Sequence, residues 1–575
     1  MPPSPLNVAA HLARMAAEQP TRVAVYFPRR RVRPEGESEH IAITFAELNA
    51  DADRLAYALD SIGVQRGVRT VLMVPPSPDF FALTFALFKV AAVPVFIDPG
   101  MGLKNLGRCL AEAEPAAFIG VPKAHLARRL FGWGRKTIRI TVNVGRRKFF
   151  CHYSLRQFRE PRLPHHPYRM EELSSDEPAA ILFTSGSTGI AKGAEYTHGN
   201  FAAQVECLKA TYGIEPGEID LCTFPLFALF GPALGMTCVI PDMDPSRPAR
   251  IDPRKAVAQI RQFQVTNMFG SPAVLRRLGE LSTPLESLRR VISAGAPASA
   301  AAIERFAKLL PESAQVFTPY GATEALPIAN IGSREILSET RHLTEQGKGV
   351  CVGRPVAGMD VSIIPITDEP IPEWSDSLML PPGEVGEIVV RGPVVTRRYY
   401  NRPDATALAK IHDPRTDDIL HRMGDIGYID DRGRLWFCGR KSHRVVTPWG
   451  TLFTDMVEPV FNTVSYRTAL VGVTRDGVTY PVVCVEPWGP PPPNLKVHPI
   501  AWEQIETRLR TLGERFEHTR QIKMFLKHMR PFPVDVRHNS KIFREKLAVW
   551  ADKKLGARWR PEGLAVEHPG VESRV

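Results

Sequence analysis

The sequence predicts an α/β protein with two domains of unequal size, and three observations support this class. First, 575 residues are too many for a single hydrophobic core. Second, segments with helical periodicity alternate with short apolar runs over the first part of the chain, which is typical of largely parallel sheets covered by helices. Third, from about residue 349 the pattern changes to short strands separated by Gly and Pro turns.

The first elements follow one another at short intervals. Thr44 is a suitable N-cap for a helix over residues 45–62, because its hydroxyl can accept a hydrogen bond from a free N–H of the first turn. A strand is predicted over residues 70–74. A buried helix over 80–90 and a second strand over 94–97 follow it.

The later part of the large domain continues the alternation. An apolar run predicts a buried strand over residues 179–183, a β-branched run predicts one over 291–293, and a helix is expected over 300–310. Residues 349–437 predict a small β-rich subdomain. Its strands are expected at residues 361–364, 386–391 and 434–437.

A change of pattern after Gly439 divides the chain. We expect an N-terminal domain over residues 1–439 and a small C-terminal domain over residues 440–575. A hinge is expected at 440–443. The last twenty or so residues are expected to form a loosely packed tail.

The bulk composition indicates a soluble globular protein, with 44% hydrophobic and 23% charged residues. The eight cysteines contain no C-x-x-C pair and no regular spacing, which favours reduced thiols and gives no zinc site. The first residues lack the charged and apolar regions of a signal peptide. A cytoplasmic location is therefore expected.

Two apolar stretches approach the length of a membrane-spanning helix, which needs about 20 residues. Residues 80–97 are interrupted by Lys89 and Pro94. Residues 224–240 carry no charge, yet their prolines and glycines would break a continuous helix. Both stretches therefore predict buried core or the wall of an apolar tunnel.

Part of the net charge of +12 comes from basic residues between Lys123 and Lys148, which are interleaved with aromatic residues. One interpretation is a solvated surface. The functional interpretation is peripheral contact with a membrane or docking of a partner protein. Because no known nucleic-acid-binding module accompanies this cluster, no nucleic acid partner is expected.

The strongest motif follows the apolar strand predicted at residues 179–183. It consists of Thr184, Ser185, Gly186, Ser187, Thr188, Gly189 and Lys192. Glycines let backbone N–H groups approach an anion, hydroxyls add donors, and lysine adds a positive charge, which together suit the phosphates of a nucleotide. A Walker A loop is the weaker interpretation, because Ala191 and Gly193 stand where its second glycine and its metal-binding hydroxyl belong.

A second motif occupies residues 319–324. An aromatic residue followed by Gly, and then by Thr and Glu, suits a turn at a nucleotide. Tyr320 is expected to stack on a base beside Gly321, Thr323 to contact phosphate, and Glu324 to hold Mg²⁺.

Three further segments belong to the same set. A glycine-rich turn with Gly295, Ala296 and Pro297 follows the predicted strand at 291–293. Asp425 lies between glycines, where its carboxylate can accept hydrogen bonds from both hydroxyls of a ribose. Arg440 and Lys541 supply cations at the predicted hinge and near the C-terminus.

Together these motifs resemble those of the adenylate-forming superfamily, which comprises acyl-CoA synthetases, peptide-synthetase adenylation domains and luciferases. The resemblance covers about residues 42–547, and the motifs occur in the order of that family. It implies a large N-terminal domain of layered αβαβα sheets with a small β-rich subdomain, followed by a small mobile α+β lid domain. It also implies ATP and Mg²⁺ as cofactors.

The resemblance implies a role for each candidate residue. Lys541, Thr184 and Glu324 are the implied catalytic residues, and Glu324 is the implied metal ligand. The implied nucleotide-binding residues are Thr184, Ser185, Gly186, Ser187, Thr188, Gly189, Lys192, Gly295, Ala296, Pro297, Tyr320, Gly321, Thr323, Asp425 and Arg440. Ser540 replaces the glycine that usually precedes the catalytic lysine.

The chain departs from the common pattern where other members deliver a thiol. Ser442 stands at the pivot, where Asp or Lys is common, and Pro448 and Trp449 stand where a Lys-Gly pair borders the pantetheine channel. Ala228 replaces a usual histidine. These departures count against coenzyme A or a carrier thiol as the acceptor.

These details, with the segments at residues 227–230, 321–328 and 349–355, resemble the β-lactone synthetases of olefin biosynthesis. The resemblance implies adenylation of a long-chain 2-alkyl-3-hydroxy acid, whose 3-hydroxyl then expels AMP and closes a β-lactone. It implies partnership with a β-lactone decarboxylase and a ketone reductase. His198 and His443 are candidates, by position, for the base that this closure needs.

Two alternatives remain. A long-chain acyl-CoA or acyl-carrier ligase would use the same adenylation residues. A nucleotide-binding protein without catalysis is disfavoured, because Thr323, Glu324, Asp425 and Lys541 are all present.

Overall fold

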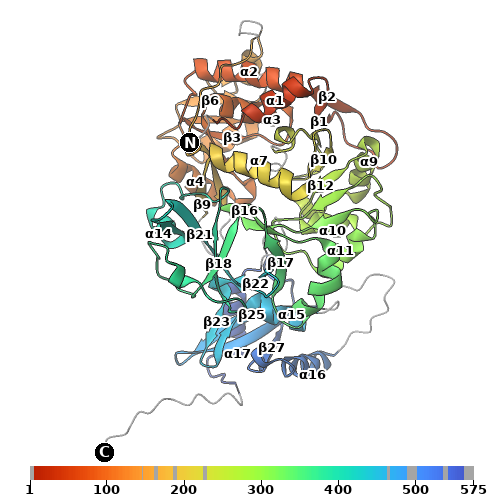
Figure 1. Ribbon diagram of the computed structural model, residues 1–575, viewed down its shortest axis with the longest axis vertical. Helices are drawn as coiled ribbons and strands as arrows, with labels where there is room; N and C mark the ends of the chain where they lie inside the picture. The colour runs from red at the N-terminus through yellow and green to blue at the C-terminus, as the bar shows by residue number, and fades with distance from the viewer. Residues whose placement is uncertain are drawn as a thin grey trace, which may run out of the picture.

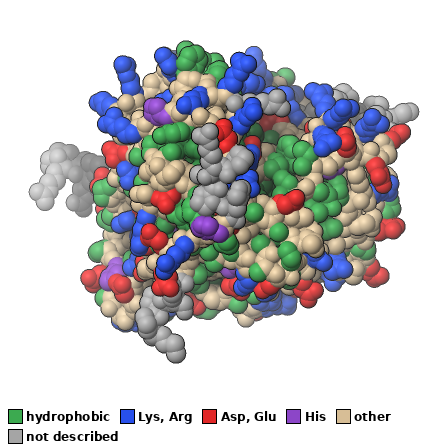
Figure 2. Space-filling model, turned by 90° about the horizontal axis from the view of Figure 1, so that it is seen from above, with side chains coloured by type: hydrophobic (Ala, Val, Ile, Leu, Met, Phe, Trp, Pro, Cys, Tyr) green, Lys and Arg blue, Asp and Glu red, His purple; other side chains and the backbone are tan. Residues whose placement is uncertain are grey.

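The structure, a computed structural model, describes residues 6–145, 147–160, 166–184, 191–224, 230–462, 466–487, 501–534 and 542–561. The molecule is elongated, with the N-terminal helices at one end and the C-terminal elements at the other (Figure 1). Residues 320–440 lie between them. The face seen from above in Figure 2 carries many Lys and Arg side chains among hydrophobic ones.

The first α/β sheet holds the strand that precedes the predicted phosphate loop. In spatial order its described strands are β7 (Tyr153–Ser154), β6 (Ile140–Asn143), β5 (Ala117–Gly120), β3 (Arg69–Met73), β4 (Val93–Ile97), β8 (Pro178–Thr184) and β9 (Lys192–Thr197). Neighbouring strands are parallel except for β8 and β9, which are antiparallel. The helices connected to this sheet are α2 (Phe45–Ser61), α3 (Pro78–Lys89), α4 (Leu103–Ala113), α5 (Pro122–Leu130) and α6 (Leu155–Phe158).

The second α/β sheet has the same character. Its described strands are, in spatial order, β14 (Gln315–Phe317), β13 (Arg290–Ile292), β12 (Asn267–Phe269), β10 (Ile219–Cys222), β11 (Thr237–Val239), β1 (Val23–Pro28) and β2 (His40–Thr44). All pairs are parallel except β1 with β2. The associated helices are α1 (Ala10–Glu18), α7 (His198–Tyr212), α9 (Pro253–Phe263), α10 (Pro272–Leu278) and α11 (Ala300–Ala307).

Helices α3 and α7 form the layer between the two sheets. Every residue of α3 from Phe80 to Lys89 is buried, and its side chains share one hydrophobic core with strands of both sheets. The Phe88 ring of α3 lies 5.7 Å from the Phe201 ring of α7. The alternation of helices, sheets and central helices confirms the predicted αβαβα class.

A charged pair anchors the central helix. The Lys89 ammonium, which is 2% exposed, lies 2.5 Å from Asp53 Oδ1 on α2 and also donates to Asn49. A buried charge is tolerated only when it is paired in this way. The predicted cap of α2 is confirmed, because Thr44 and Glu47 exchange side-chain and backbone hydrogen bonds as a capping box.

The third sheet is antiparallel throughout its described part. Its strands are β15 (Tyr320–Ala322), β16 (Ala325–Asn330), β17 (Val350–Pro355), β22 (Leu435–Arg440), β21 (Asp418–Ile429), β19 (Gly386–Arg391) and β18 (Asp360–Ile364), with β20 (Lys410–Asp413) also paired to β21. Short helices accompany it: α12 (Ser333–Glu335), α13 (Arg341–Glu345) and α14 (Pro403–Ala409). The sheet takes in β15 and β16, ahead of the β-rich region predicted from residue 349.

The chain after β22 forms separate small sheets with their own cores. The strands are β23 (Val445–Thr447), β24 (Gly450–Leu452), β25 (Tyr466–Arg475), β26 (Val478–Pro487) and β27 (Met524–Lys527), and the helices are α15 (Thr454–Phe461), α16 (Trp502–Gly513) and α17 (Arg544–Leu555). Two hydrophobic clusters here contain only residues beyond 440. The predicted domain boundary falls where β22 ends, directly before a 3₁₀ turn at Lys441–His443.

The two apolar stretches adopt the structure expected of them as far as the structure describes it. Residues 80–97 comprise α3 from Phe80 to Lys89 and then β4. Among the described residues, no helix is both long and apolar enough to cross a membrane.

Candidate active site

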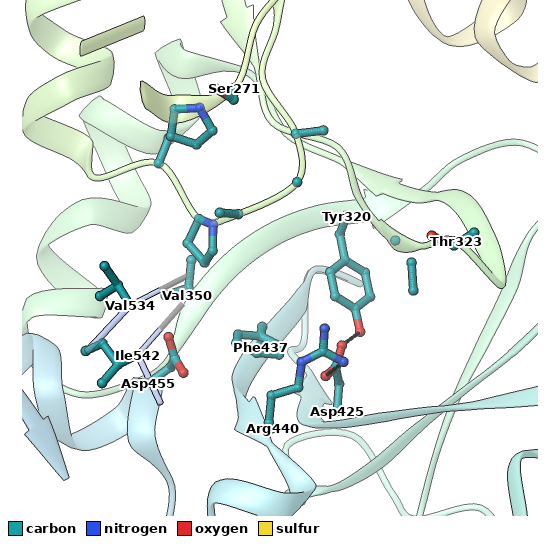
Figure 3. A pocket seen from close by; sticks show the side chains of 18 of the residues that line it. Ser271, Tyr320, Thr323, Val350, Asp425, Phe437, Arg440, Asp455, Val534 and Ile542 are labelled. Atoms are coloured by element: carbon teal, nitrogen blue, oxygen red, sulfur yellow. Dashed lines mark hydrogen bonds and ion pairs between the residues drawn. The ribbon is translucent and has the colours of Figure 1, made fainter. Parts of the chain in front are cut away.

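A cleft of about 3930 Å³ opens where the three sheets meet the C-terminal elements. Residues that directly follow parallel strands line it, and this edge of an α/β sheet is where ligands usually bind. They include Val74 after β3, Asp98 after β4, Val121 after β5, Thr223 after β10 and Ser293 after β13. Figure 3 shows the part of the cleft near Tyr320 and Asp425.

Asp425, Tyr320 and Arg440 come together in this cleft, from three different strands. The Tyr320 hydroxyl donates to Asp425 Oδ2 over 2.6 Å, and Arg440 Nη1 lies 2.8 Å from Oδ1 (Figure 3). The register of β21 and β22 places Asp425 directly opposite Arg440. Tyr320 and Arg440 are 105 and 15 residues away from Asp425 in the sequence, yet both contact its carboxylate.

The Asp425 carboxylate retains capacity for a ligand. It is 2% exposed, and burial raises its pKa while Arg440 opposes that shift. The contact between Arg440 and Oδ1 is an ion pair without hydrogen-bond geometry, so Oδ1 accepts no hydrogen bond among the described residues. A buried acceptor of this kind fits the hydroxyls of a ribose.

Tyr320 presents a ring on the wall of the same cleft. Burial and the neighbouring Asp425 carboxylate raise the pKa of its hydroxyl well above the usual value, so it remains a hydrogen-bond donor. Its ring lies 6.2 Å from that of Phe437. At Gly321 a side chain would meet the Ala325 carbonyl at 2.7 Å, which explains the glycine in the motif.

The turn after β13 forms another wall of the cleft, and Gly295, Ala296 and Pro297 all line it. Gly295 has a φ of +93°, a conformation that side chains other than glycine rarely adopt. The hydroxyls of Ser293 and Ser271 are buried and have no hydrogen-bond partner among the described residues. Unpartnered hydroxyls beside a glycine turn suit the polar edge of a base.

Glu324 is held at the cleft wall by neighbours from distant parts of the chain. The Tyr399 hydroxyl donates to Glu324 Oε1 over 2.6 Å. Thr396 donates to the Glu324 carbonyl through both its amide, at 2.9 Å, and its hydroxyl, at 3.1 Å. The preceding residue is fixed as well, because the Tyr196 hydroxyl donates to the Thr323 carbonyl.

This donor set fits Mg²⁺ bound together with a nucleotide. Among the described residues, no cluster of three His, Cys, Asp or Glu side chains could hold a metal without other ligands. Mg²⁺ typically takes one or two carboxylates and completes its shell with water and substrate phosphates. Glu324 is 9% exposed, lines the cleft and supplies one such carboxylate.

The structure describes only the two ends of the predicted phosphate loop. Thr184 ends β8 and Lys192 begins β9. Ser185, Gly186, Ser187, Thr188 and Gly189 lie outside the described residues. Lys192 lines the cleft, and its ammonium lies 5.0 Å from the centre of the Tyr399 ring. The lysine of the loop therefore lies beside the group that positions Glu324.

Lys541 also lies outside the described residues, but its neighbours are placed. Val534 and Ile542 form an isolated antiparallel bridge, and both line the cleft near Val350 and Asp455 (Figure 3). The segment that carries Lys541 therefore starts and ends at the cleft.

The two histidines considered as bases lie in different places. His198 is fully buried, its Nδ1 accepts from the Val8 amide, and its ring packs near Phe88. It does not line the described cleft. His443 does line it, and burial together with Arg544 and Arg440 lowers its pKa to about 4.

Sequence reasoning missed His421, which also lines the cleft. On β21 it lies four residues before Asp425, and both residues line the cleft. Its Nδ1 donates to the Ala409 carbonyl over 3.1 Å. Burial, reinforced by Lys410, Lys192 and Arg440, lowers its pKa well below the usual value, so the ring is neutral. Its position four residues before Asp425 was the only signal for it in the sequence.

Two groups of apolar side chains line the same cleft. One group comes from the first sheet and α3: Leu72, Val74, Phe80, Phe96 and Leu182. The other comes from α7, from β12 and from the chain between β10 and β11: Phe201, Leu208, Phe224, Phe230 and Phe269. The expectation that residues 224–240 contribute an apolar wall is supported at Phe224 and Phe230, whereas 225–229 lie outside the described residues.

Comparison with known proteins agrees with this geometry. The family model described as AMP-binding enzyme matches residues 12–400. The chain therefore belongs to the AMP-binding enzyme family, whose members are ATP-dependent, AMP-forming enzymes.

Its relatives are more specific. The chain is 48% identical over 550 residues to the olefin β-lactone synthetase of Xanthomonas campestris pv. campestris, covering 95% of this chain and 97% of that protein. It is 47% identical over 560 residues to the olefin β-lactone synthetase of Stenotrophomonas maltophilia, covering 96% and 99%. The solved structure of O-succinylbenzoate coenzyme A synthetase (MenE) from Bacillus subtilis with ATP and magnesium ion shares the fold, with a TM-score of 0.70 and 20% identity over 93% of this chain and 98% of that one.

Proposed function

We propose that this protein is an ATP-dependent β-lactone synthetase of long-chain olefin biosynthesis. Its substrate would be a 2-alkyl-3-hydroxy acid, which it adenylates and closes to a β-lactone with release of AMP and pyrophosphate. The observation that carries the proposal is a single cleft lined by Asp425, Glu324 and two groups of apolar side chains. The near full-length identity to two olefin β-lactone synthetases supports it.

In the first step a carboxylate oxygen of the substrate attacks the α-phosphorus of ATP, and the bond to pyrophosphate breaks. Asp425 and Tyr320 would hold the ribose and the base, and Thr184 to Lys192 would surround the phosphates. Lys541 would bridge the carboxylate and the α-phosphate. Mg²⁺ at Glu324 would neutralise charge on the departing pyrophosphate. Such positioned charges account for most catalysis of phosphoryl chemistry.

In the second step the 3-hydroxyl oxygen bonds to the acyl carbon, and the bond from that carbon to the AMP oxygen breaks. The hydroxyl proton passes to a base. Because nucleophile and carbonyl belong to one molecule, alignment replaces an external reactant, and effective molarities of aligned groups are very large. The two groups of apolar side chains would align the alkyl branches of the substrate, one chain against each.

The principal alternative is a long-chain acyl-CoA or acyl-carrier ligase. To separate the two, a 3-hydroxy acid and its 3-deoxy analogue are each incubated with Mg·ATP, with and without coenzyme A. For a β-lactone synthetase, we expect multiple-turnover AMP release that requires the hydroxyl and does not respond to coenzyme A. Formation of a thioester from the 3-deoxy acid would instead establish the ligase.

We propose His421 as the base for lactone closure. It lines the cleft, and its bond to the Ala409 carbonyl leaves Nε2 as the acceptor nitrogen. The variant His421→Asn should form acyl-adenylate at nearly the normal rate but close the lactone about 10²- to 10⁴-fold more slowly, the usual contribution of a general base. Rapid-quench assays that quantify acyl-adenylate and lactone would measure both steps.

His443→Asn provides the matched control, because His443 is the last residue of the hinge turn and lines the same cleft. If His443→Asn stops closure and His421→Asn does not, the base is His443. An equal loss of both steps in His421→Asn would indicate a structural role instead.

The remaining parts of the proposal concern cellular context. The eight cysteines are free thiols, which supports a cytoplasmic location. A β-lactone decarboxylase and a ketone reductase would act after and before this enzyme and could associate with it. Because the substrate is lipid-like, peripheral contact with a membrane is also part of the proposal.

A further inference from the structure

We propose that one surface of the protein docks on an anionic lipid bilayer. This docking surface consists of the start of α4, the exposed side of α5 and the segments at residues 131–139 and 147–150. It adjoins the mouth of the apolar cleft. The docking itself does not depend on the proposed reaction, whereas its use for substrate entry does.

The charge of this region is unusual. Between residues 115 and 159 the sequence contains eleven Lys and Arg residues and no Asp or Glu, so this segment contributes +11 to a chain whose net charge is 73 − 61 = +12. Eight of these basic residues are described as exposed: Lys123, Arg129, Arg135, Lys136, Arg139, Arg147, Lys148 and Arg156. None of the eight forms an ion pair with a carboxylate in the described part of the chain, although other basic residues of this protein commonly do.

Large apolar side chains are exposed among these cations. Leu130 is 71% exposed, Phe150 76%, Phe131 53%, Leu126 50% and Leu103 52%. With Phe149, they make up six of the twelve large hydrophobic residues that are exposed in the described parts of the chain. Scattered apolar residues need no explanation, but a concentration of them marks an interaction site.

Contacts between these segments show that they form one surface. The Arg129 guanidinium lies 5.3 Å from the centre of the Phe150 ring, which joins the end of α5 to the loop at 147–150. The Phe131 ring stacks on Trp133 with centroids 5.5 Å apart. Trp133 in turn packs on α4, because a β-carbon added to Gly107 would lie 3.0 Å from its Nε1.

The docking surface lies beside the mouth of the cleft. Met101, Asn105 and Val121 line the cleft, and exposed Leu103 lies between the first two in sequence. Helix α5 begins directly after Val121. Since a helix rises 1.5 Å per residue, Leu126 lies only about 7 Å further along its axis. A long-chain acid that partitions into a bilayer would therefore reach the mouth without crossing water.

The combination of features favours a bilayer over a protein partner. Unpaired Lys and Arg side chains attract anionic headgroups, while exposed Leu and Phe side chains insert at the boundary between headgroups and acyl chains. An acidic protein could pair with the Lys and Arg side chains. It would also need a separate apolar pocket for each exposed residue, such as Leu130 and Phe150.

The test is cosedimentation of the purified full-length protein with vesicles of phosphatidylcholine, with or without phosphatidylglycerol. We expect binding to the anionic vesicles that weakens with salt. The charge-reversed variant Arg129→Glu, Lys136→Glu, Lys148→Glu should bind them at least tenfold more weakly, and so should Leu130→Ser, Phe150→Ser. Pyrophosphate exchange with a short soluble acid should stay unchanged in both, which shows that they are folded.

The matched control is Lys553→Glu, Lys554→Glu, Arg558→Glu, because these exposed residues lie on or just after α17 and the net charge change is the same. The control should bind vesicles like the parent protein. An equal loss in the control, or full binding by the first variant, would overturn the docking surface. Absence of vesicle binding by the parent protein, with capture of a purified pathway enzyme that the first variant loses, would assign the surface to a protein.

Discussion

Replacing Glu324 by Gln is expected to slow acyl-adenylate formation by about 10²- to 10³-fold, the usual cost of removing one group that stabilises transition-state charge. Gln retains an oxygen that can accept the hydrogen bond now donated by Tyr399, so the local structure should survive. What is lost is the negative charge for the metal. Magnesium-dependent exchange of labelled pyrophosphate into ATP would measure the effect, with Mg²⁺ titrated over a wide range.

Glu345→Gln is the control for this prediction. Glu345 lies at the same cleft, but its side chain is 61% exposed and pairs with Arg341 on the surface. It should exchange pyrophosphate at nearly the normal rate. If Glu345→Gln lost as much activity as Glu324→Gln, or if the latter kept full activity at low Mg²⁺, Glu324 would not be the metal ligand.

The arrangement around Glu324 shows what sequence reasoning could reach. The motif at residues 319–324 predicts a carboxylate at a nucleotide, and the structure places that carboxylate in the cleft. The groups that hold it, Thr396 and Tyr399, are 72 and 75 residues away. No local pattern marks them, because their function arises only when β16 and the segment after β19 pack together.

His421 illustrates the same limit. Its neighbours on β21 belong to a recognisable motif, yet its chemistry depends on the Ala409 carbonyl and on Lys410 across the sheet. The side chain is neutral because burial and nearby cations disfavour a further charge. A sequence gives the residue type, whereas the direction of a pKa shift needs its three-dimensional surroundings.

The buried strands of the first sheet were predicted more accurately than the extent of the third sheet. Apolar runs at 70–74, 94–97 and 179–183 correspond to β3, β4 and β8 within two residues, because burial on both faces leaves a strong signal. The hairpin of β15 and β16 was not predicted as part of this sheet. Gly321 lies in β15 and Pro327 in β16, and both residue types weaken the pattern that predicts a strand.

The docking surface was visible in the sequence only as a cluster of basic and aromatic residues. The sequence could not show which aromatic side chains are exposed: Trp133 is 7% exposed, whereas Phe150 is 76% exposed. Their packing against α4 and α5 decides this, and with it the distinction between a core residue and a contact for lipid.

Replacing Lys541 by Ala is expected to slow adenylation by about 10²- to 10³-fold, because the cation that would bridge the carboxylate and the α-phosphate is removed. When synthetic acyl-adenylate is supplied, closure to the lactone should proceed at nearly the normal rate. Lys553→Ala on α17 is the control and should leave both steps unchanged. Lys541→Ala should therefore slow adenylation and spare closure, whereas His421→Asn should slow closure and spare adenylation. Together the two variants assign each step to its own residue. Full adenylation by Lys541→Ala would show that another cation acts in the first step, and slow closure would place Lys541 in the second.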